Sequence, residues 1–200
     1  EGYGLTECSP VVAVNKNYEE RRVGTVGPVL RGYEWKLLDD KNRDVTPSGE
    51  GVLWVKGPSV TTGYFRDPAM SEGRFVDGWF NTGDYVKIED GYVKILDRVT
   101  DIIIVGGFNV YPQEVEAIIN THPAVSQSVV VGIPHPVNGE VPKAFVRLHE
   151  GAAVTSREII AFCKKHLAHF KVPRSVEFME NLPLSSTGKV LRRLLRQKEK

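Results

Sequence analysis

The chain has few cysteines, no long apolar run and no large excess of charge of either sign. Only Cys8 and Cys163 occur, far apart and in no metal-like spacing, which argues against a disulfide, a nucleophile or a sulfur metal site. No apolar run reaches the roughly 20 residues that a membrane-spanning helix needs. No charged leader followed by an apolar stretch opens the chain. We therefore expect buried or half-buried thiols in a soluble, cytoplasmic protein.

The composition suits a folded chain with one or two modest cores, because 41% of the 200 residues are hydrophobic and 26% are charged. The net charge of +1 hides an asymmetry: residues 1–97 carry 12 basic and 16 acidic side chains, whereas residues 98–200 carry 14 and 9. The positive charges lie beside specific loops and form no stripe interleaved with aromatic residues. This pattern favours small phosphorylated ligands over nucleic acid.

Residues 23–95 consist of short apolar or alternating runs separated by turns. Residues 85–88 and 92–96, for example, flank the dipeptide Asp90-Gly91, which is typical of a hairpin. The pattern predicts a small β-rich, barrel-like subdomain in residues 1–97.

After Arg98 the pattern changes to that of an α+β domain, residues 98–200. A strand is expected at 101–105, a bend at Gly106-Gly107 and a helix from Pro112 to Thr121, with strands near 126–133 and 144–148. Thr155 and Glu158 form a capping-box pattern that opens a further helix.

A flexible loop near the C-terminus, Pro183-Leu-Ser-Ser-Thr-Gly-Lys189, precedes a basic segment that contains leucines. A lysine held in this way can bind phosphate oxygens. Taken alone, however, a Gly-Lys pair before a helix is more often an ordinary turn with a solvated charge. The interpretation of Lys189 therefore depends on the other segments of the chain.

Those segments occur in a fixed order: Tyr3-Gly-Leu-Thr-Glu7, Gly49–Gly57 running on to Gly63-Tyr64, Trp79–Asp84, and Asp97–Glu116. With the lysine loop, and over essentially all 200 residues, the chain resembles the adenylate-forming family of acyl-CoA synthetases, luciferases and peptide-synthetase adenylation domains. Within that family it is most similar to the fatty-acyl-CoA synthetases, through residues 2–10, 78–84 and 107–112.

The resemblance implies the C-terminal part of an AMP-forming long-chain fatty acid CoA ligase, an acid-thiol ligase acting through an acyl-adenylate. Residues 1–97 would end the large N-terminal domain, and residues 98–200 would be a mobile lid. The family's phosphate loop lies upstream of Tyr3, so we expect the 200 residues to be inactive alone. The hinge residue, usually aspartate or lysine in the family, is Thr100 here, which leaves hinge control open.

The resemblance also implies a role for individual side chains. Lys189 would be the catalytic cation between the acyl carboxylate and the α-phosphate of ATP, and Glu7 would bind Mg²⁺. The remaining binding residues would be Tyr3 on adenine, Thr6 on phosphate, Asp84 on the ribose, Arg98 on ribose or phosphate, and Gly107 beside the pantetheine arm of CoA. Taken alone, Asp84 follows Thr82-Gly83 and is more often part of an ordinary turn, and the other side chains are more often core packing, solvated acids, hairpin bends or salt bridges.

Two alternatives stay open. The first is an aryl-CoA ligase or another adenylate-forming enzyme with a different acceptor, and the second is a lid or interaction module without catalysis. Fatty acid, ATP and CoA are the expected partners, without nucleic acid. A peripheral membrane contact through residues 190–196 and a homodimer are left open, as is the length of the acyl chain.

Overall fold

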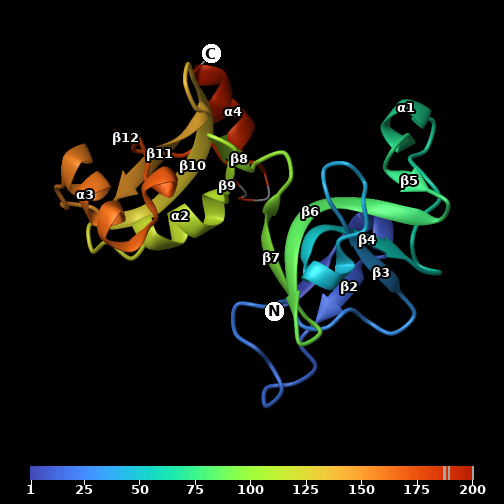
Figure 1. Ribbon diagram of the computed structural model, residues 1–200. Helices are drawn as coiled ribbons and strands as arrows, with labels where there is room; N and C mark the ends of the chain where they lie inside the picture. Colours follow the sequence, from blue (N-terminus) through green and yellow to red (C-terminus); the bar gives the residue numbers. More distant parts are fainter. Residues whose placement is uncertain (187, 189, 200) are drawn as a thin grey trace. The chain divides into compact units, whose positions relative to one another are not determined.

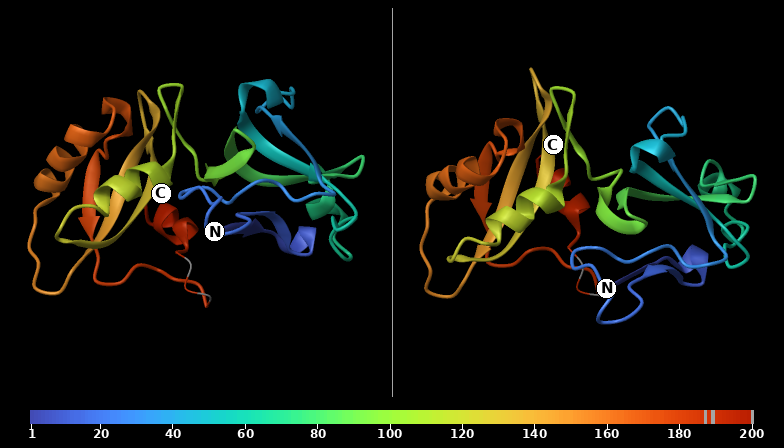
Figure 2. Two further views of the ribbon diagram at one scale, coloured as in Figure 1. Left: turned by 90° about the horizontal axis from the view of Figure 1, so that it is seen from below. Right: turned by 60° about the horizontal axis from the view of Figure 1, so that its bottom comes forward.

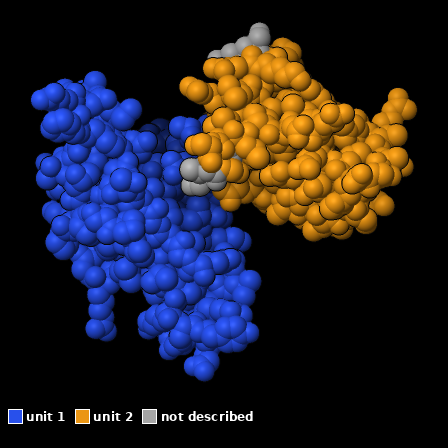
Figure 3. Space-filling view, turned by 180° about the vertical axis from the view of Figure 1, so that it is seen from behind, with its two compact units in different colours: residues 1–100 blue, residues 101–200 orange. Residues whose placement is uncertain are grey.

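The structure is a computed structural model that describes residues 1–186, 188 and 190–199. It divides into two compact units, Glu1–Thr100 and Asp101–Lys200, which Figure 3 shows in two colours. We call them unit 1 and unit 2. The domain boundary expected between residues 97 and 98 and the lid role of the second part remain predictions.

Unit 1 is almost entirely β-structure (Figure 1). The strands β1 and β2 form an antiparallel pair, and a second antiparallel sheet has the order β3-β4-β6, with β5 and β7 both paired to β6. Three short helical turns connect them. The elements are β1 (Gly2–Gly4), η1 (Thr6–Cys8), β2 (Val11–Val14), β3 (Glu34–Leu38), η2 (Thr46–Ser48), β4 (Glu50–Lys56), α1 (Pro68–Ser71), β5 (Phe75–Val76), β6 (Trp79–Glu89) and β7 (Tyr92–Arg98).

The hairpin predicted around Asp90-Gly91 joins β6 to β7. Both residues have positive φ angles, 50° and 79°, as a two-residue hairpin of this type requires. Isolated bridges from residues 28–29 reach Ala13 and Tyr92 and so connect the two sheets. Among the described strands, however, β3 pairs only with β4, so the expected barrel-like subdomain is an open sheet and not a closed barrel.

Unit 2 is the predicted α+β domain. Its sheet has the order β10-β11-β8-β9, and β12 pairs in parallel with β11. The helix predicted from Pro112 ends at Ile119, two residues before the expected end. The elements are β8 (Ile103–Val105), β9 (Phe108–Val110), α2 (Pro112–Ile119), β10 (Val125–His135), β11 (Gly139–Leu148), α3 (Ser156–His166), η3 (His169–Lys171), β12 (Ser175–Phe178) and α4 (Arg192–Lys198).

The alternation of side chains along β10 builds two cores in unit 2. Val130 faces the cluster that includes Val115 of α2 and Ile159 of α3, whereas Val129 belongs to the cluster that includes Leu195 of α4. Helices α2 and α3 therefore cover one face of the sheet and α4 covers the other, as the views in Figure 2 show.

Both cysteines are buried, as the sequence predicted. Cys8 packs in the core of unit 1 and Cys163 in the core of unit 2. Burial raises the pKa of each thiol to about 11. The thiols are therefore protonated at neutral pH, and their role is packing.

The capping box at the start of α3 gives a test of local stability. The Thr155 hydroxyl accepts the Glu158 N–H at 3.3 Å, and the Glu158 carboxylate accepts the Thr155 N–H at 2.8 Å. We expect Thr155→Ala to lower the free energy of unfolding by about 1 kcal/mol in denaturant titrations, because the Glu158 N–H loses the hydroxyl that accepts it. Thr155→Ser keeps the hydroxyl and is expected to retain wild-type stability; an equal loss in both variants would contradict the capping role.

Candidate functional site

Three of the predicted binding residues meet in unit 1. Tyr3 of β1 donates its phenolic proton to Asp84 Oδ2, and the Arg98 Nε lies 2.7 Å from Asp84 Oδ1. The pairing of β6 with β7 places Asp84 directly opposite Arg98. The Asp84 side chain is only 3% exposed, whereas that of Arg98 is 53% exposed. A buried carboxylate therefore has one donor on each oxygen, and one of these donors reaches the surface.

Asp84 follows Gly83 in a strand, not in the turn expected from the sequence. The register between β4 and β6 shifts at this point, and Gly83 has a φ of 73° inside β6. This is a β-bulge, which re-aims the side chain that follows. The Thr82 hydroxyl donates to the Leu53 carbonyl at 2.7 Å and accepts the Asp84 N–H at 3.1 Å. The bulge is thereby fixed to the neighbouring strand.

Burial affects the protonation of both Asp84 and Tyr3. Burial raises the pKa of Asp84, while the hydrogen bond from Tyr3 and the charges of Arg98 and Arg74 oppose that rise. Burial, and then the adjacent carboxylate, raise the pKa of the Tyr3 phenol far above its ordinary value. Tyr3 is therefore a proton donor throughout the physiological range, and ligand hydroxyls would reach Asp84 only by replacing a present donor.

Glu7 and Thr6 lie in the short turn η1, close to this group. The Tyr64 hydroxyl donates to Glu7 Oε1 at 2.6 Å, and the Thr61 N–H donates to the Glu7 carbonyl at 2.8 Å. The charge of Glu7 is near enough to add to the raised pKa of Asp84. Thr6 is exposed. Tyr64 lies in the segment Gly63-Tyr64, and no role could be predicted for it from the sequence, since only the fold brings it to Glu7.

In the described part of the chain, no group of three His, Cys, Asp or Glu side chains could hold a metal ion. Glu7 nevertheless fits a single-carboxylate site, because Mg²⁺ keeps several waters and takes further oxygens from substrate phosphates. The donor set fits Mg²⁺ bound together with a nucleotide better than a resident protein-held metal.

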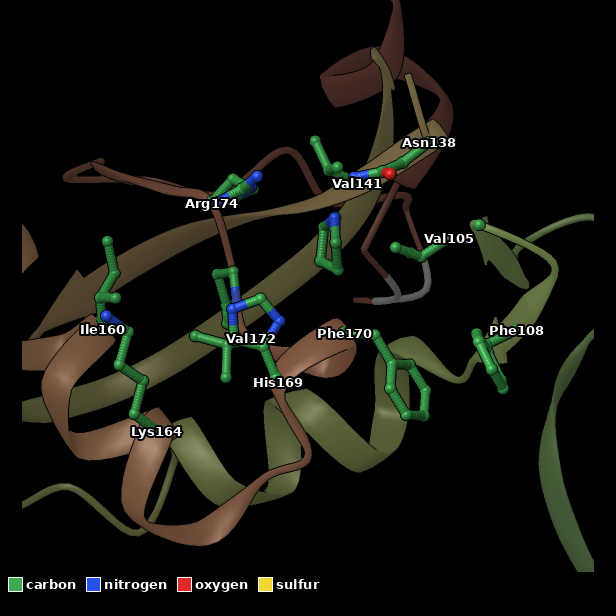
Figure 4. A pocket seen from close by; sticks show the side chains of 13 residues that line it. Val105, Phe108, Asn138, Val141, Ile160, Lys164, His169, Phe170, Val172 and Arg174 are labelled. Atoms are coloured by element: carbon green, nitrogen blue, oxygen red, sulfur yellow. The ribbon is translucent and has the colours of Figure 1, made fainter. Parts of the chain in front are cut away.

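A cavity of about 420 Å³ opens in unit 2 (Figure 4). Phe108 and Phe170 stack in its wall with ring centroids 4.9 Å apart. Three side chains that carry or can carry positive charge, from Lys164, His169 and Arg174, share the lining with apolar groups. The site combines an apolar surface with groups that attract anions. The sequence interpretation left residues 169–174 outside the site, and only the fold brings α3, β11 and η3 together.

The predicted Gly107 lies beside this cavity, and its neighbour Gly106 is part of the lining. Both have positive φ angles, 57° for Gly106 and 89° for Gly107, at the bend between β8 and β9. The Gly106 N–H donates to the Asn138 carbonyl at 2.9 Å. The bend is confirmed, and glycine adopts such positive φ angles without the strain that a Cβ atom would add.

Lys189 lies outside the described residues, so its catalytic role remains a prediction. The chain on either side of it is described. Val190 forms an isolated antiparallel bridge with Leu184, and the Leu191 N–H donates to the Pro183 carbonyl at 2.8 Å. These contacts bring together the two ends of the segment that contains Lys189.

Two family profiles match the chain. The profile described as AMP-binding enzyme matches residues 1–65, and that described as AMP-binding enzyme C-terminal domain matches residues 114–189. Among curated relatives, a long-chain-fatty-acid–CoA ligase of Salmonella typhimurium is 45% identical over 197 residues. That alignment covers 98% of this chain and 35% of the relative, so the chain spans about a third of the relative's length.

Solved structures agree with the sequence matches. The ATP-bound MatB of Rhodopseudomonas palustris superposes with a TM-score of 0.90 at 39% identity, over 99% of this chain and 40% of that one. The o-succinylbenzoate CoA synthetase of Bacillus subtilis, in complex with an acyl-adenylate intermediate, gives a TM-score of 0.88 at 34% identity, over 98% of this chain and 40% of that one.

The hydrogen bond between Tyr3 and Asp84 gives a direct test. Because this bond lowers the pKa of Asp84, we expect Tyr3→Phe to raise that pKa further, measured by NMR titration of the Asp84 carboxyl carbon. A folded-state pKa above the ordinary one means that the stability contributed by Asp84 falls as the pH rises through the folded value. In Tyr3→Phe this fall is expected to extend to higher pH.

Tyr64→Phe is the matched control, since Tyr64 donates to Glu7 and not to Asp84. It is expected to leave the titration of Asp84 unchanged. A lowered pKa of Asp84 in Tyr3→Phe, or an equal rise in both variants, would contradict the assigned contact.

Proposed function

The chain belongs to the AMP-binding enzyme family, and we propose that it is the C-terminal part of an AMP-forming fatty-acyl-CoA synthetase. The reaction joins a fatty acid to CoA in two steps. The acid first attacks the α-phosphorus of ATP, giving acyl-adenylate and pyrophosphate, and the CoA thiol then displaces AMP. The aliphatic substrate is taken from relatives named long-chain-fatty-acid–CoA ligase, which this chain matches over 98% of its length.

The observation that supports the adenylation step best is the group of Tyr3, Asp84 and Arg98. A ribose offers two hydroxyls as donors, and a buried carboxylate with acceptor oxygens is the matching partner. Arg98 would turn its exposed guanidinium to ribose or phosphate oxygens, and the Tyr3 ring would contact adenine. Binding would thus replace the present donors on Asp84 with the hydroxyls of the nucleotide, so that each carboxylate oxygen would keep a donor.

The remaining predicted residues would bind the phosphates of ATP or neutralise their negative charge. Glu7 would hold Mg²⁺, which neutralises phosphate oxygens when the nucleotide is bound. The Thr6 hydroxyl would donate to a phosphate oxygen. Lys189 would stabilise the negative charge that accumulates at the α-phosphate as the acyl carboxylate attacks.

For the second step we propose the cavity of unit 2 as the binding site of CoA. CoA combines a chain with apolar segments and several phosphates, and the cavity combines phenylalanine rings with Lys164, His169 and Arg174. Gly106 and Gly107 leave open space where a Cβ atom would lie. The backbone at this bend therefore allows close approach of the pantetheine arm.

An aryl-CoA synthetase is the second candidate, since one of the structural neighbours is named an o-succinylbenzoate CoA synthetase. The length and the aromatic or aliphatic nature of the acid would separate the two. The comparison needs pyrophosphate release and thioester formation measured in parallel across acids of both kinds.

A peripheral membrane contact through α4 remains a prediction. Leu191 and Leu194 are exposed, whereas Leu195 is buried in the cluster that includes Val129 of β10. None of the described helices is both long and apolar enough to cross a membrane. Membrane association would therefore rest on the exposed leucines and the basic residues beside them.

The role of Lys189 is tested in the full-length protein that carries this chain. We expect Lys189→Ala to lower pyrophosphate release on the order of 100- to 1000-fold, because a preorganised charge is lost from the transition state. Thioester formation from supplied acyl-adenylate is expected to fall far less. Arg193→Ala, which removes an exposed positive charge nearby, is the control and should leave both steps unchanged. Equal losses in the two steps of Lys189→Ala would count against the role.

The proposed CoA site makes a separate prediction. Arg174→Ala is expected to raise the KM for CoA about tenfold, since a charge-assisted hydrogen bond to phosphate is lost, and to leave pyrophosphate release unchanged. Lys165→Ala removes an exposed charge next to Lys164 that does not line the cavity, and should leave the KM unchanged. An unaltered KM in Arg174→Ala would place CoA elsewhere.

A further inference from the structure

Tyr64 holds the carboxylate of Glu7 from a distant loop of unit 1. Its hydroxyl donates to Glu7 Oε1 at 2.6 Å, and 57 positions separate the two residues in the sequence. The Thr61 N–H donates to the Glu7 carbonyl at 2.8 Å. The loop that contains residues 61–64 therefore binds Glu7 at its side chain and at its backbone.

Tyr64 is itself fixed by two kinds of contact. Its ring packs edge-on against Phe75, with ring centroids 5.4 Å apart, and Phe75 stacks on Phe80 at 4.9 Å. Phe80 is buried in the core of unit 1. The Tyr64 N–H donates to the hydroxyl of Ser71, the last residue of α1, at 2.9 Å. Ring packing and backbone contact together define where the phenol oxygen lies.

The turn that carries Glu7 has a second tyrosine as a support. The Tyr33 hydroxyl donates to the Cys8 carbonyl at 2.7 Å and accepts the Ser59 hydroxyl at 2.7 Å. The Cys8 side chain is buried in the core of unit 1. Tyr33 therefore supports the backbone of η1, whereas Tyr64 binds the carboxylate itself.

A hydrogen bond to one carboxylate oxygen restricts the rotation of the group and so sets where the other oxygen lies. Mg²⁺ demands near-ideal octahedral geometry and takes oxygen ligands, so it tolerates little displacement of a ligating carboxylate. A neighbouring residue that orients such a ligand commonly contributes about 10- to 100-fold to metal affinity. Orientation matters most where a single carboxylate supplies the protein's bond to the metal.

We propose that Tyr64 is a positioning residue for Glu7, and that its hydroxyl holds one carboxylate oxygen so that the other faces the divalent cation that accompanies ATP. The proposal rests on the proposed function, in which Glu7 binds Mg²⁺ during adenylation. Loss of the hydroxyl weakens the contribution of Mg²⁺ to nucleotide binding and leaves binding without the metal intact.

The test measures nucleotide binding by the full-length protein that carries this chain. Isothermal titration calorimetry gives the Kd of α,β-methylene ATP, which cannot release pyrophosphate, in EDTA and in excess Mg²⁺. The ratio of the first Kd to the second is the tightening due to the metal. Tyr64→Phe is expected to lower this ratio about tenfold, with the Kd in EDTA unchanged. A wild-type ratio in Tyr64→Phe would overturn the proposal.

Tyr33→Phe is the matched control, because it removes a hydroxyl that supports the same turn at Cys8. Its ratio should stay at the wild-type value. Phenylalanine at position 64 keeps the ring that packs on Phe75, and thermal unfolding verifies that each variant folds. A fall in Tyr33→Phe as large as in Tyr64→Phe would assign the effect to general support of the turn and overturn the positioning role.

Glu7→Ala separates this proposal from the one on which it rests. If Tyr64 acts through Glu7, Tyr64→Phe lowers the ratio no further in the Glu7→Ala background. The same fold-loss in both backgrounds would overturn the positioning role and leave the assignment of Glu7 intact. No tightening by Mg²⁺ in the wild type, or an unchanged ratio in Glu7→Ala, would overturn that assignment and this proposal with it. Pyrophosphate release with fatty acids tests the adenylation reaction independently.

Discussion

A buried carboxylate needs hydrogen-bond donors, and this requirement organises unit 1 around Asp84. Leaving such a group without partners would cost several kcal/mol, so the fold has to bring donors from elsewhere. Tyr3 supplies one from β1, and Arg98 supplies the other from the end of β7. Strand β1, near the start of the chain, is thus joined to the β6–β7 hairpin at one side chain. The same contacts leave Arg98 half in solvent, where a ligand could draw it away.

Unit 2 uses a similar principle with a different result. Glu116 and Arg192 satisfy each other and the backbone of Val130, so an edge strand is closed by side chains instead of another strand. Around Asp84 the partners are of a kind that a ligand with hydroxyl groups could replace, whereas around Glu116 every contact is internal. This difference is why we assign a ligand to the first group and not to the second.

Local features were the most predictable from sequence. The Asp90-Gly91 hairpin and the Thr155 capping box appear as expected, because each depends on residues adjacent in the chain. Asp84 shows the limit: its position after Thr82-Gly83 suggested a turn, and pairing with β4 made it a bulged strand. The barrel-like subdomain predicted for residues 1–97 was likewise wrong, because the sheet is open. Closure of a barrel depends on how its two edge strands meet and not on the pattern of any one strand.

The family, the order of its segments and the alternation of apolar residues along each strand can all be predicted from the sequence, because motifs and periodicity are properties of neighbouring residues. The fold was needed to show that Tyr3 and Arg98 share one carboxylate, that Tyr64 reaches Glu7, and that phenylalanine rings and basic side chains border one cavity. These contacts join residues dozens of positions apart, and their geometry follows from strand register and helix packing, which no local pattern encodes.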